Sequence, residues 1–221
     1  FSHGALRALA ARFADREVGC AAGRVAYQYG GDTTSRGFRA YQRIAVAVRR
    51  AENAFGSQTS VSGSIHAMRR EFYRPGEPAF SMDVIDAVDT VAQGKRAVYE
   101  YDAVSFEESR VSTRDGFRAR VRISIQNNRM VSYILRELVR NRRWFFLFQM
   151  ISHKMLRWWL WLPLAILLAS SLALGVESPH YRVLALAQLA FYGIASLGLT
   201  RHLSGPLSGF AAACAFFVTG N

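Results

Sequence analysis

The sequence has only two cysteines, Cys20 and Cys214, and they lie far apart along the chain. Cys20 belongs to a charged region and Cys214 to an apolar run, so we expect no disulfide between them and no oxidising compartment. The sequence also shows no Cys/His cluster with metal-ligand spacing, no Ser/His pairing and no glycine-rich phosphate loop. It therefore offers no signature of a zinc site, of acyl transfer or of a P-loop nucleotidase.

Charge is almost absent after Trp158. Of the 28 Lys and Arg residues, 26 precede Trp158, as do 15 of the 16 Asp and Glu residues. Residues 110–157 alone contain twelve basic and two acidic residues, a local net charge of +10, and an aromatic, apolar stretch follows directly (WWLWL). A basic segment that ends at such a stretch is typical of a protein at the cytoplasmic surface of a membrane.

The sequence pI of about 10.5 raises nucleic acid as a possible partner. However, the basic excess borders an apolar segment and lacks the interleaved aromatic residues that stack on bases. We therefore expect no nucleic-acid partner, and we expect anionic lipid and sugar-phosphate groups instead.

Three uncharged runs follow the basic segment. About 20 apolar residues in a helix cross the roughly 30 Å of hydrocarbon in a bilayer. The sequence thus predicts transmembrane helices at about residues 158–176, 183–200 and 203–219, the last interrupted by Pro206. Because basic residues favour the cytoplasmic side, we expect a multi-pass protein with residues 1–157 in the cytoplasm.

The first part of the chain alternates helical and strand patterns. Leu6, Leu9, Ala10 and Phe13 share one face of a predicted short helix. The predicted elements, in order, are a helix at 5–13, a strand at 18–29, a polar loop at 29–37, a helix at 38–55 and a strand or tight turn at 61–65. A helix opened by Asp83 and stopped by Gly94 follows, and then strands at 96–101 and 104–106. The apolar face of the helix at 38–55 is formed by Phe38, Tyr41, Ile44, Ala45, Val48 and Phe55. This alternation predicts an α/β layer arrangement.

Residues 144–157 predict an amphipathic helix that lies in the membrane interface. Aromatic and aliphatic residues dominate the segment. Its polar residues fall on roughly one helical face: Gln149, Ser152, His153, Lys154 and Arg157. His153 and Lys154 either contact phosphate or anchor the helix at the interface, and the second role is the more common one.

Three stretches, in this order, resemble membrane-bound family 2 glycosyltransferases such as cellulose, hyaluronan and exopolysaccharide synthases. Residues 62–71 (SGSIHAMRRE) resemble a G-x-x-x-A-x-R-R-E segment, and Asp83 with residues 94–103 (GKRAVYEYDA) resembles the acidic helix and the G-x-R-x-x-Y block after it. Residues 117–123 (FRARVRI) resemble the arginine motif, and residues 147–154 (LFQMISHK) resemble the LQ-x-x-SHK interfacial helix. In this chain, Met82 stands where an acid often precedes the catalytic Asp, and Ala119 and Ile123 stand where processive members have Gln and Trp.

The resemblance implies three regions. Residues 1–116 would be the second half of a GT-A nucleotide-sugar transferase domain, 117–157 an arginine-rich segment with an interfacial helix, and 158–221 transmembrane helices of a bacterial inner-membrane protein. The chain begins at Phe1 and lacks the DxD metal motif, so we expect it to be an internal piece of a longer protein. A divalent metal, Mg²⁺ or Mn²⁺, is expected in the full-length protein, with ligands outside this chain. The isolated piece is expected to be inactive and to bind nucleotide poorly.

The resemblance also implies site residues. Asp83 would be the catalytic base, although a helix-capping role is the simpler interpretation from composition alone. Arg118 and Arg122, four apart on a helix, would bind a diphosphate or the acceptor sugar, or else face lipid headgroups. Ser62 and Gly63 would approach the acceptor sugar, or form a plain turn. We expect Asp86 and Asp89 to be surface charges, and Glu52 to be a surface or capping charge.

The expected function is inverting transfer of a sugar from a nucleotide-sugar, by resemblance a UDP-sugar, to a growing β-linked polysaccharide at the cytoplasmic membrane face. Two alternatives remain open. One is transfer of a single sugar to a lipid-linked acceptor, because the arginine motif departs from the processive pattern. The other is a non-catalytic membrane assembly subunit whose basic face binds anionic lipid.

Overall fold

The computed structural model describes residues 1–28, 34–77, 79–108 and 113–200, together with Phe210, Ala211, Cys214, Phe217 and Val218. The chain divides into two compact units. Unit 1 comprises Phe1–Gly30 and Ala40–Met155, and unit 2 comprises Gly31–Arg39 and Leu156–Asn221. The elements are α1 (Ala5–Arg12), β1 (Val18–Gln28), α2 (Thr34–Phe55), β2 (His66–Met68), the short 3₁₀ turn η1 (Arg70–Phe72), α3 (Met82–Ala92), β3 (Arg96–Glu108), α4 (Thr113–Arg140), α5 (Trp144–Met150), the π-turn η2 (Ile151–Met155), α6 (Leu156–Trp158), α7 (Trp161–Leu174) and α8 (Pro179–Thr200).

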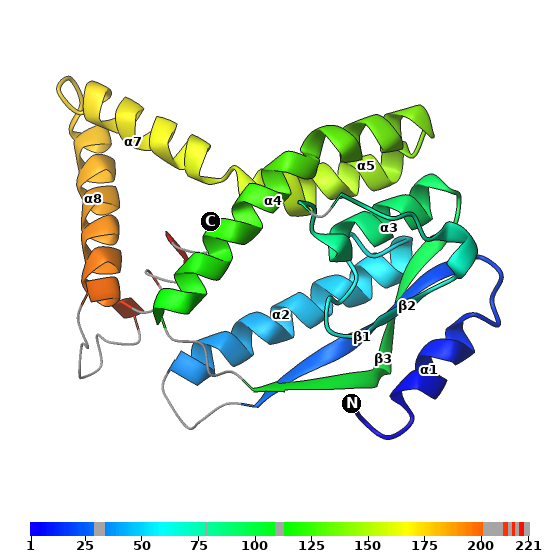
Figure 1. The fold of residues 1–221 in the computed structure, drawn as a ribbon. Coiled ribbons are helices and arrows are strands. Elements are labelled where there is room, and N and C mark those ends of the chain that lie inside the picture. The colour runs from blue at the N-terminus through cyan, green and yellow to red at the C-terminus, as the bar shows by residue number, and fades with distance from the viewer. Residues whose placement is uncertain are drawn as a thin grey trace. The chain divides into compact units, whose positions relative to one another are not determined.

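Unit 1 is built on a three-stranded mixed sheet with the order β2-β1-β3 (Figure 1). The central strand β1 pairs parallel with β3 and antiparallel with β2, so that Cys20 faces Ala97 on one side and Met68 on the other. The predicted strands at 96–101 and 104–106 are one continuous strand, β3, because its pairing with β1 continues past a register shift. The predicted mixed α/β class is confirmed.

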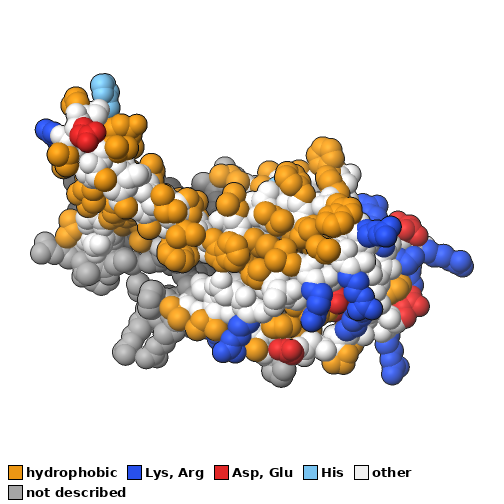
Figure 2. All heavy atoms as spheres, turned by 90° about the horizontal axis from the view of Figure 1, so that it is seen from above, with side chains coloured by type: hydrophobic (Ala, Val, Ile, Leu, Met, Phe, Trp, Pro, Cys, Tyr) orange, Lys and Arg blue, Asp and Glu red, His pale blue; other side chains and the backbone are white. Residues whose placement is uncertain are grey.

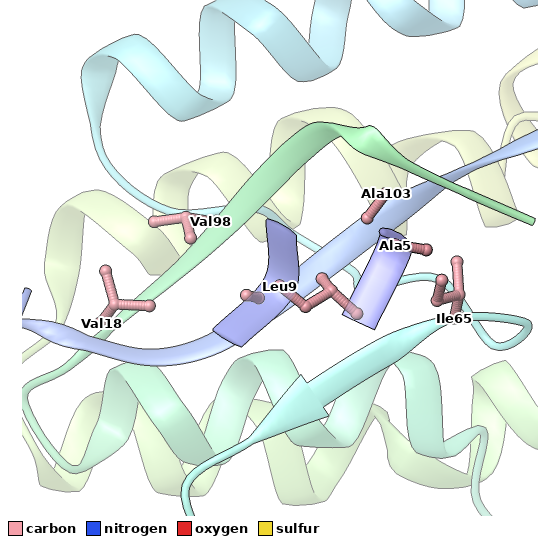
Figure 3. Close-up of a cluster of buried hydrophobic side chains, with 7 residues drawn as sticks. Ala5, Leu9, Val18, Ile65, Val98 and Ala103 are labelled. Carbon is pink, nitrogen blue, oxygen red and sulfur yellow. The ribbon is translucent and has the colours of Figure 1, made fainter. Parts of the chain in front are cut away.

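The two faces of the sheet carry separate hydrophobic clusters, because successive strand residues point to opposite sides. On one face, the small cluster of Figure 3 packs between α1 and the sheet: Ala5, Leu9, Val18, Ala21, Ile65, Val98 and Ala103. On the other face, a second cluster joins strands β1 and β3 to α3 and to the segment before β2: Cys20, Ala22, Val61, Ala87, Ala97 and Tyr99. The sheet is thus covered on both faces.

Helix α1 forms where the sequence predicts it, but with a different buried face. Ala5 and Leu9 are buried against the sheet, whereas Leu6 is 71% exposed and Ala10 is exposed. The prediction that Leu6 and Ala10 belong to the buried face is wrong. The sheet instead contacts the helix face that carries Ala5 and Leu9.

Helix α2 begins at Thr34, so the predicted loop at 29–37 is wrong from that residue on. Its predicted inward residues Ile44, Val48 and Phe55 are exposed, and the side chains of Phe38 and Tyr41 lie outside the described residues. Polar groups instead attach the end of α2 to the sheet. The side chain of Asn53 accepts a hydrogen bond from the Tyr99 amide at 2.8 Å.

Helix α3 begins at Met82, with Asp83 in its first turn, and Gly94 follows its end with a φ of +87°. The predicted inward residues are buried: Val84, Ile85, Val88, Val91 and Ala92. Asp86 and Asp89 are buried as well, 4% and 1% exposed, so the expectation of surface charges is wrong for both. The reason is that α3 packs against the sheet and α4, and each buried carboxylate has a polar partner: His66 of β2 for Asp86 and Tyr133 of α4 for Asp89.

Helices α4 and α5 of unit 1 expose many large apolar side chains. On α5 and the π-turn these are Trp144, Phe145, Phe148 and Ile151, whereas the polar Gln149 is buried. Figure 2 views the molecule from the side of α4 and α5 and shows hydrophobic side chains gathered over them. The exposed side of 144–157 is thus largely apolar, but Phe146, Leu147 and Met150 are buried as well, so the polar and apolar residues do not separate onto two faces as predicted. Its placement in a membrane interface stays a prediction.

Unit 2 contains the apolar helices α7 and α8. By length and composition, the stretch Pro179–Gly198 of α8 is the one single helix in the described part of the chain that is long and apolar enough to cross a membrane. The helices Trp144–Trp158 and Trp161–Leu174 pass the same test only when they are counted together as one broken span. The predicted third span at 203–219 lies almost entirely outside the described residues.

Burial makes Cys20 a poor nucleophile. Removal of its thiol from water, together with the nearby Asp86 carboxylate, raises the pKa of Cys20 to about 12. Because the thiolate is the reactive form, we expect Cys20 in a Cys214→Ser variant to resist alkylation at neutral pH in the native state. Mass spectrometry after iodoacetamide treatment, with and without denaturant, measures this. Equal labelling rates in the two states would show that Cys20 is accessible.

Candidate active site at the start of helix α3

Asp83 is held at the start of α3 by contacts on both sides. Its side chain accepts a hydrogen bond from the Ser81 hydroxyl, and its main-chain carbonyl accepts one from the Val61 amide at 2.8 Å. Ser81, not Asp83, occupies the N-cap position, and Asp83 lies in the first turn, where the helix dipole favours a negative charge. The side chain of Asp83 is only partly buried. An ionised and reachable carboxylate at a fixed position is what a general base requires.

The segment that contacts Asp83 is polar and buried. Residues 57–62 (SQTSVS) are all buried, which is unusual for five polar residues out of six. Main-chain hydrogen bonds from Gln58 to the Ala97 carbonyl and from Val61 to the Asp83 carbonyl, both 2.8 Å, place it between β3 and α3. The segment is therefore fixed by the sheet rather than exposed as a loop.

Ser62 and Gly63 continue this segment into an exposed turn. The Ser62 hydroxyl is buried and has no hydrogen-bond partner in the described part of the chain. Gly63 is exposed, and a methyl group added at its Cα would meet nothing within 4 Å. The sequence alternatives for residues 61–65 thus resolve to a turn, with open space above Gly63. Of the two predicted residues, Gly63 is the one that a ligand could approach directly.

His66, the first residue of β2, lies between this turn and α3. Its Nδ1 bonds to the Ser62 carbonyl at 2.8 Å, and its Nε2 bonds to Asp86 Oδ2 at 3.0 Å. The hydrogen bond to Asp86 is the main cause of a raised His66 pKa, and the charge of Asp83 adds to it. Sequence reasoning missed this pair. No local pattern signals it, because His66 and Asp86 are twenty residues apart and belong to different elements.

The predicted arginine pair is only partly placed by the structure. Arg118 and Arg122 both belong to α4, four residues apart, so the backbone puts them on one side of the helix. Arg122 is exposed and has no hydrogen bond or ion pair within the described residues, and the side chain of Arg118 lies outside them. The structure therefore joins the main chain of Asp83 to Val61, the residue before Ser62 and Gly63, and shows no contact between Arg122 and this group.

A second polar group connects residues 57–62 to the π-turn. Glu52 is 5% exposed, accepts a hydrogen bond from the Thr59 hydroxyl at 2.8 Å and lies 3.2 Å from His153 Nδ1. Lys154 donates to the Ser60 hydroxyl at 2.7 Å. Of the two roles expected for Glu52, that of a surface charge is therefore wrong. His153 and Lys154, for which phosphate contact or interface anchoring was predicted, contact Glu52 and Ser60 of the same unit.

Asp89 fastens α3 to α4. Its carboxylate accepts a hydrogen bond from the Tyr133 hydroxyl at 2.6 Å, and Arg74 pairs with Glu137 of α4 at 3.4 Å. Burial raises the pKa of Asp89. Because Asp89 is enclosed and has its own partner, its role is in packing and it lies outside the candidate site.

Among the described residues, no three His, Cys, Asp or Glu side chains gather to hold a metal ion. No protein-family model matches this chain, and comparison with curated proteins gives no match.

Proposed function

We propose that this chain is the acceptor-side half of an inverting GT-A glycosyltransferase domain of membrane-bound family 2, continued by membrane helices. The observation that carries the proposal is the position of Asp83. Asp83 lies in the first turn of α3 and its side chain is partly exposed. Its main chain is bonded to Val61, two residues before Gly63, where there is room for a ligand. The order of motifs resembling that family, with Asp83 at the position of its base, supports the same assignment.

The proposed reaction is a single displacement. The Asp83 carboxylate takes the proton from an acceptor hydroxyl, the hydroxyl oxygen forms a bond to the anomeric carbon of the donor, and the bond from that carbon to the nucleotide diphosphate breaks. The diphosphate leaves with the bonding electron pair, and positive charge nearby stabilises it. Arg118 and Arg122 are the proposed source of that charge on the acceptor side. A divalent metal in the full-length protein would supply further charge neutralisation.

We also propose a membrane location, with an acceptor that is delivered at, or exported through, the bilayer. The apolar outer side of α5 and the apolar helix α8 both suit lipid. The basic excess of residues 110–157 suits an anionic cytoplasmic leaflet. We therefore propose the bacterial inner membrane as the location and a β-linked polysaccharide as the product.

Sugar transfer by the full-length protein in membranes tests the proposal. Radiolabelled UDP-sugars are supplied with Mg²⁺ or Mn²⁺, and both released UDP and labelled product are measured. A polymer ladder is the expected result, while a single labelled lipid would mean one-step transfer to a lipid-linked acceptor. No transfer from any nucleotide-sugar, together with binding to anionic vesicles, would replace the enzyme with an assembly subunit. The isolated 221-residue chain serves as the control that we expect to be inactive.

A further inference from the structure

The side chain of His66 faces α3 from the sheet. In the register of the sheet, His66 of β2 lies opposite Ala22 of β1. Ala22 belongs to the cluster that packs toward α3, and residues directly opposite each other project to the same face. The backbone therefore directs the imidazole toward Asp86, and the 3.0 Å contact follows from the fold.

Both ring nitrogens of His66 contact groups that only accept hydrogen bonds. Nδ1 contacts the Ser62 carbonyl, and Nε2 contacts the Asp86 carboxylate. A neutral imidazole has one N–H, so it satisfies one acceptor only, whereas the imidazolium has two N–H groups and satisfies both. The geometry therefore suits a protonated His66 that donates to both acceptors.

The charges around this imidazole come mainly from α3. Asp83 and Asp86 both act on His66. From β1 the neighbouring titratable group is Cys20, and from β3 it is Tyr99, and raised pKa values keep both of these neutral near pH 7. With His66 protonated, the two carboxylates and the imidazolium carry a net charge of −1, and with His66 neutral they carry −2.

We propose that His66 is a positioning residue for Asp83. Its imidazolium, bonded to Asp86 and to the Ser62 carbonyl, fixes the turn at Gly63 against α3. It also offsets the negative charge of Asp86 beside the proposed base. This inference rests on the proposed function. The imidazolium connects the two parts of the site, because Ser62 precedes Gly63 and Asp86 lies one helical turn after Asp83. An uncompensated second carboxylate would repel the anionic donor and the departing diphosphate.

The pH dependence has a definite sign. The folded-state pKa of His66 lies above its unfolded value, so its contribution to stability is complete below the unfolded pKa, about 6.5. That contribution is lost as pH rises through the folded-state pKa. The rate of sugar transfer should fall over the same interval, as the turn loosens and the site gains negative charge. This fall forms an alkaline limb in the pH profile of kcat.

Two variants of the full-length enzyme test the inference. His66→Gln should lower kcat about tenfold, raise the acceptor KM and remove the alkaline limb. Asp86→Asn should move that limb to lower pH, because it removes the main cause of the raised pKa. Asp89→Asn, a buried acid on the same helix bonded to Tyr133, is the matched control and should leave the limb in place. The pH dependence of thermal unfolding should lose its His66 contribution in His66→Gln, show a smaller one in Asp86→Asn and keep it in Asp89→Asn.

The outcomes separate this inference from the proposed function. Loss of transfer in Asp83→Asn, combined with a wild-type rate and an unmoved alkaline limb in His66→Gln, would overturn the inference alone. Full transfer by Asp83→Asn would overturn the proposed function, and the pH dependence of unfolding would still test the His66–Asp86 contact. If His66→Gln does not fold, Asp86→Asn decides, and an unmoved limb in that variant contradicts the inference.

Discussion

Asp83→Asn is expected to lower the kcat of sugar transfer by about 10²–10⁴-fold, the usual contribution of a general base. Asparagine has the shape of aspartate and cannot take a proton from the acceptor hydroxyl at neutral pH. The donor would still bind, because the substitution adds no bulk. The loss should therefore appear in kcat, with little change in the donor KM.

The fold should tolerate this change. The amide oxygen of asparagine can still accept the hydrogen bond from Ser81, and the bond from the Val61 amide goes to the main chain of residue 83. Unfolding measurements on the same preparation verify that the loss is catalytic. Asp89→Asn should behave in the opposite way, with lower stability and nearly normal transfer, because Asp89 is buried against Tyr133. Equal loss of activity in both variants would argue against Asp83 as the base.

Gly23→Ala is expected to destabilise unit 1 by about 3 kcal/mol, the upper part of the usual cost of overpacking. Gly23 lies at a register shift between β1 and β3. A Cβ at this position would lie 2.4 Å from the Ala103 carbonyl oxygen and 2.9 Å from Ile65 Cγ2. The carbonyl belongs to the backbone of the adjacent strand, so it cannot move aside without breaking the pairing of the sheet.

Gly63→Ala is the matched control for this substitution. A Cβ at Gly63 meets nothing within 4 Å, and the φ of Gly63 is outside the left-handed region, so the stability should change by less than about 1 kcal/mol. Denaturant unfolding of both variants, monitored by tryptophan fluorescence and circular dichroism, measures the difference. Equal stabilities for the two variants would contradict the close approach of β1 and β3 at Gly23.

Local patterns predicted the elements well where one physical signal dominated. Helix α3 has a regular apolar spacing and a terminal glycine, and it forms within one residue of its predicted start. The α/β class followed from the same alternation of patterns. Residue burial was harder to predict. On α1 the periodicity favoured Leu6, but the sheet covers the Ala5–Leu9 edge. On α2, Ile44, Val48 and Phe55 are exposed, whereas Glu52 is buried, since pairing with Thr59 and His153 stabilises its carboxylate.

The candidate site shows the same limit. Asp83 was predicted from its resemblance to a family, and its contact with the segment before β2 is a long-range feature that no local pattern contains. His66 and Asp86 are twenty residues apart and belong to different elements. A lone histidine and a helix aspartate each have an unremarkable sequence context. Their pairing depends on the sheet register, which is a property of the whole of unit 1.

The six-residue segment 57–62 has a mechanical consequence. Ser60 accepts a hydrogen bond from Lys154 of the π-turn, and the next residue, Val61, donates one to the main chain of Asp83. Adjacent Cα atoms are only about 3.8 Å apart. The attachment points of the π-turn and of α3 on this segment are therefore separated by one residue step. Two hydrogen bonds and one peptide unit thus separate the Lys154 side chain from the main chain of Asp83.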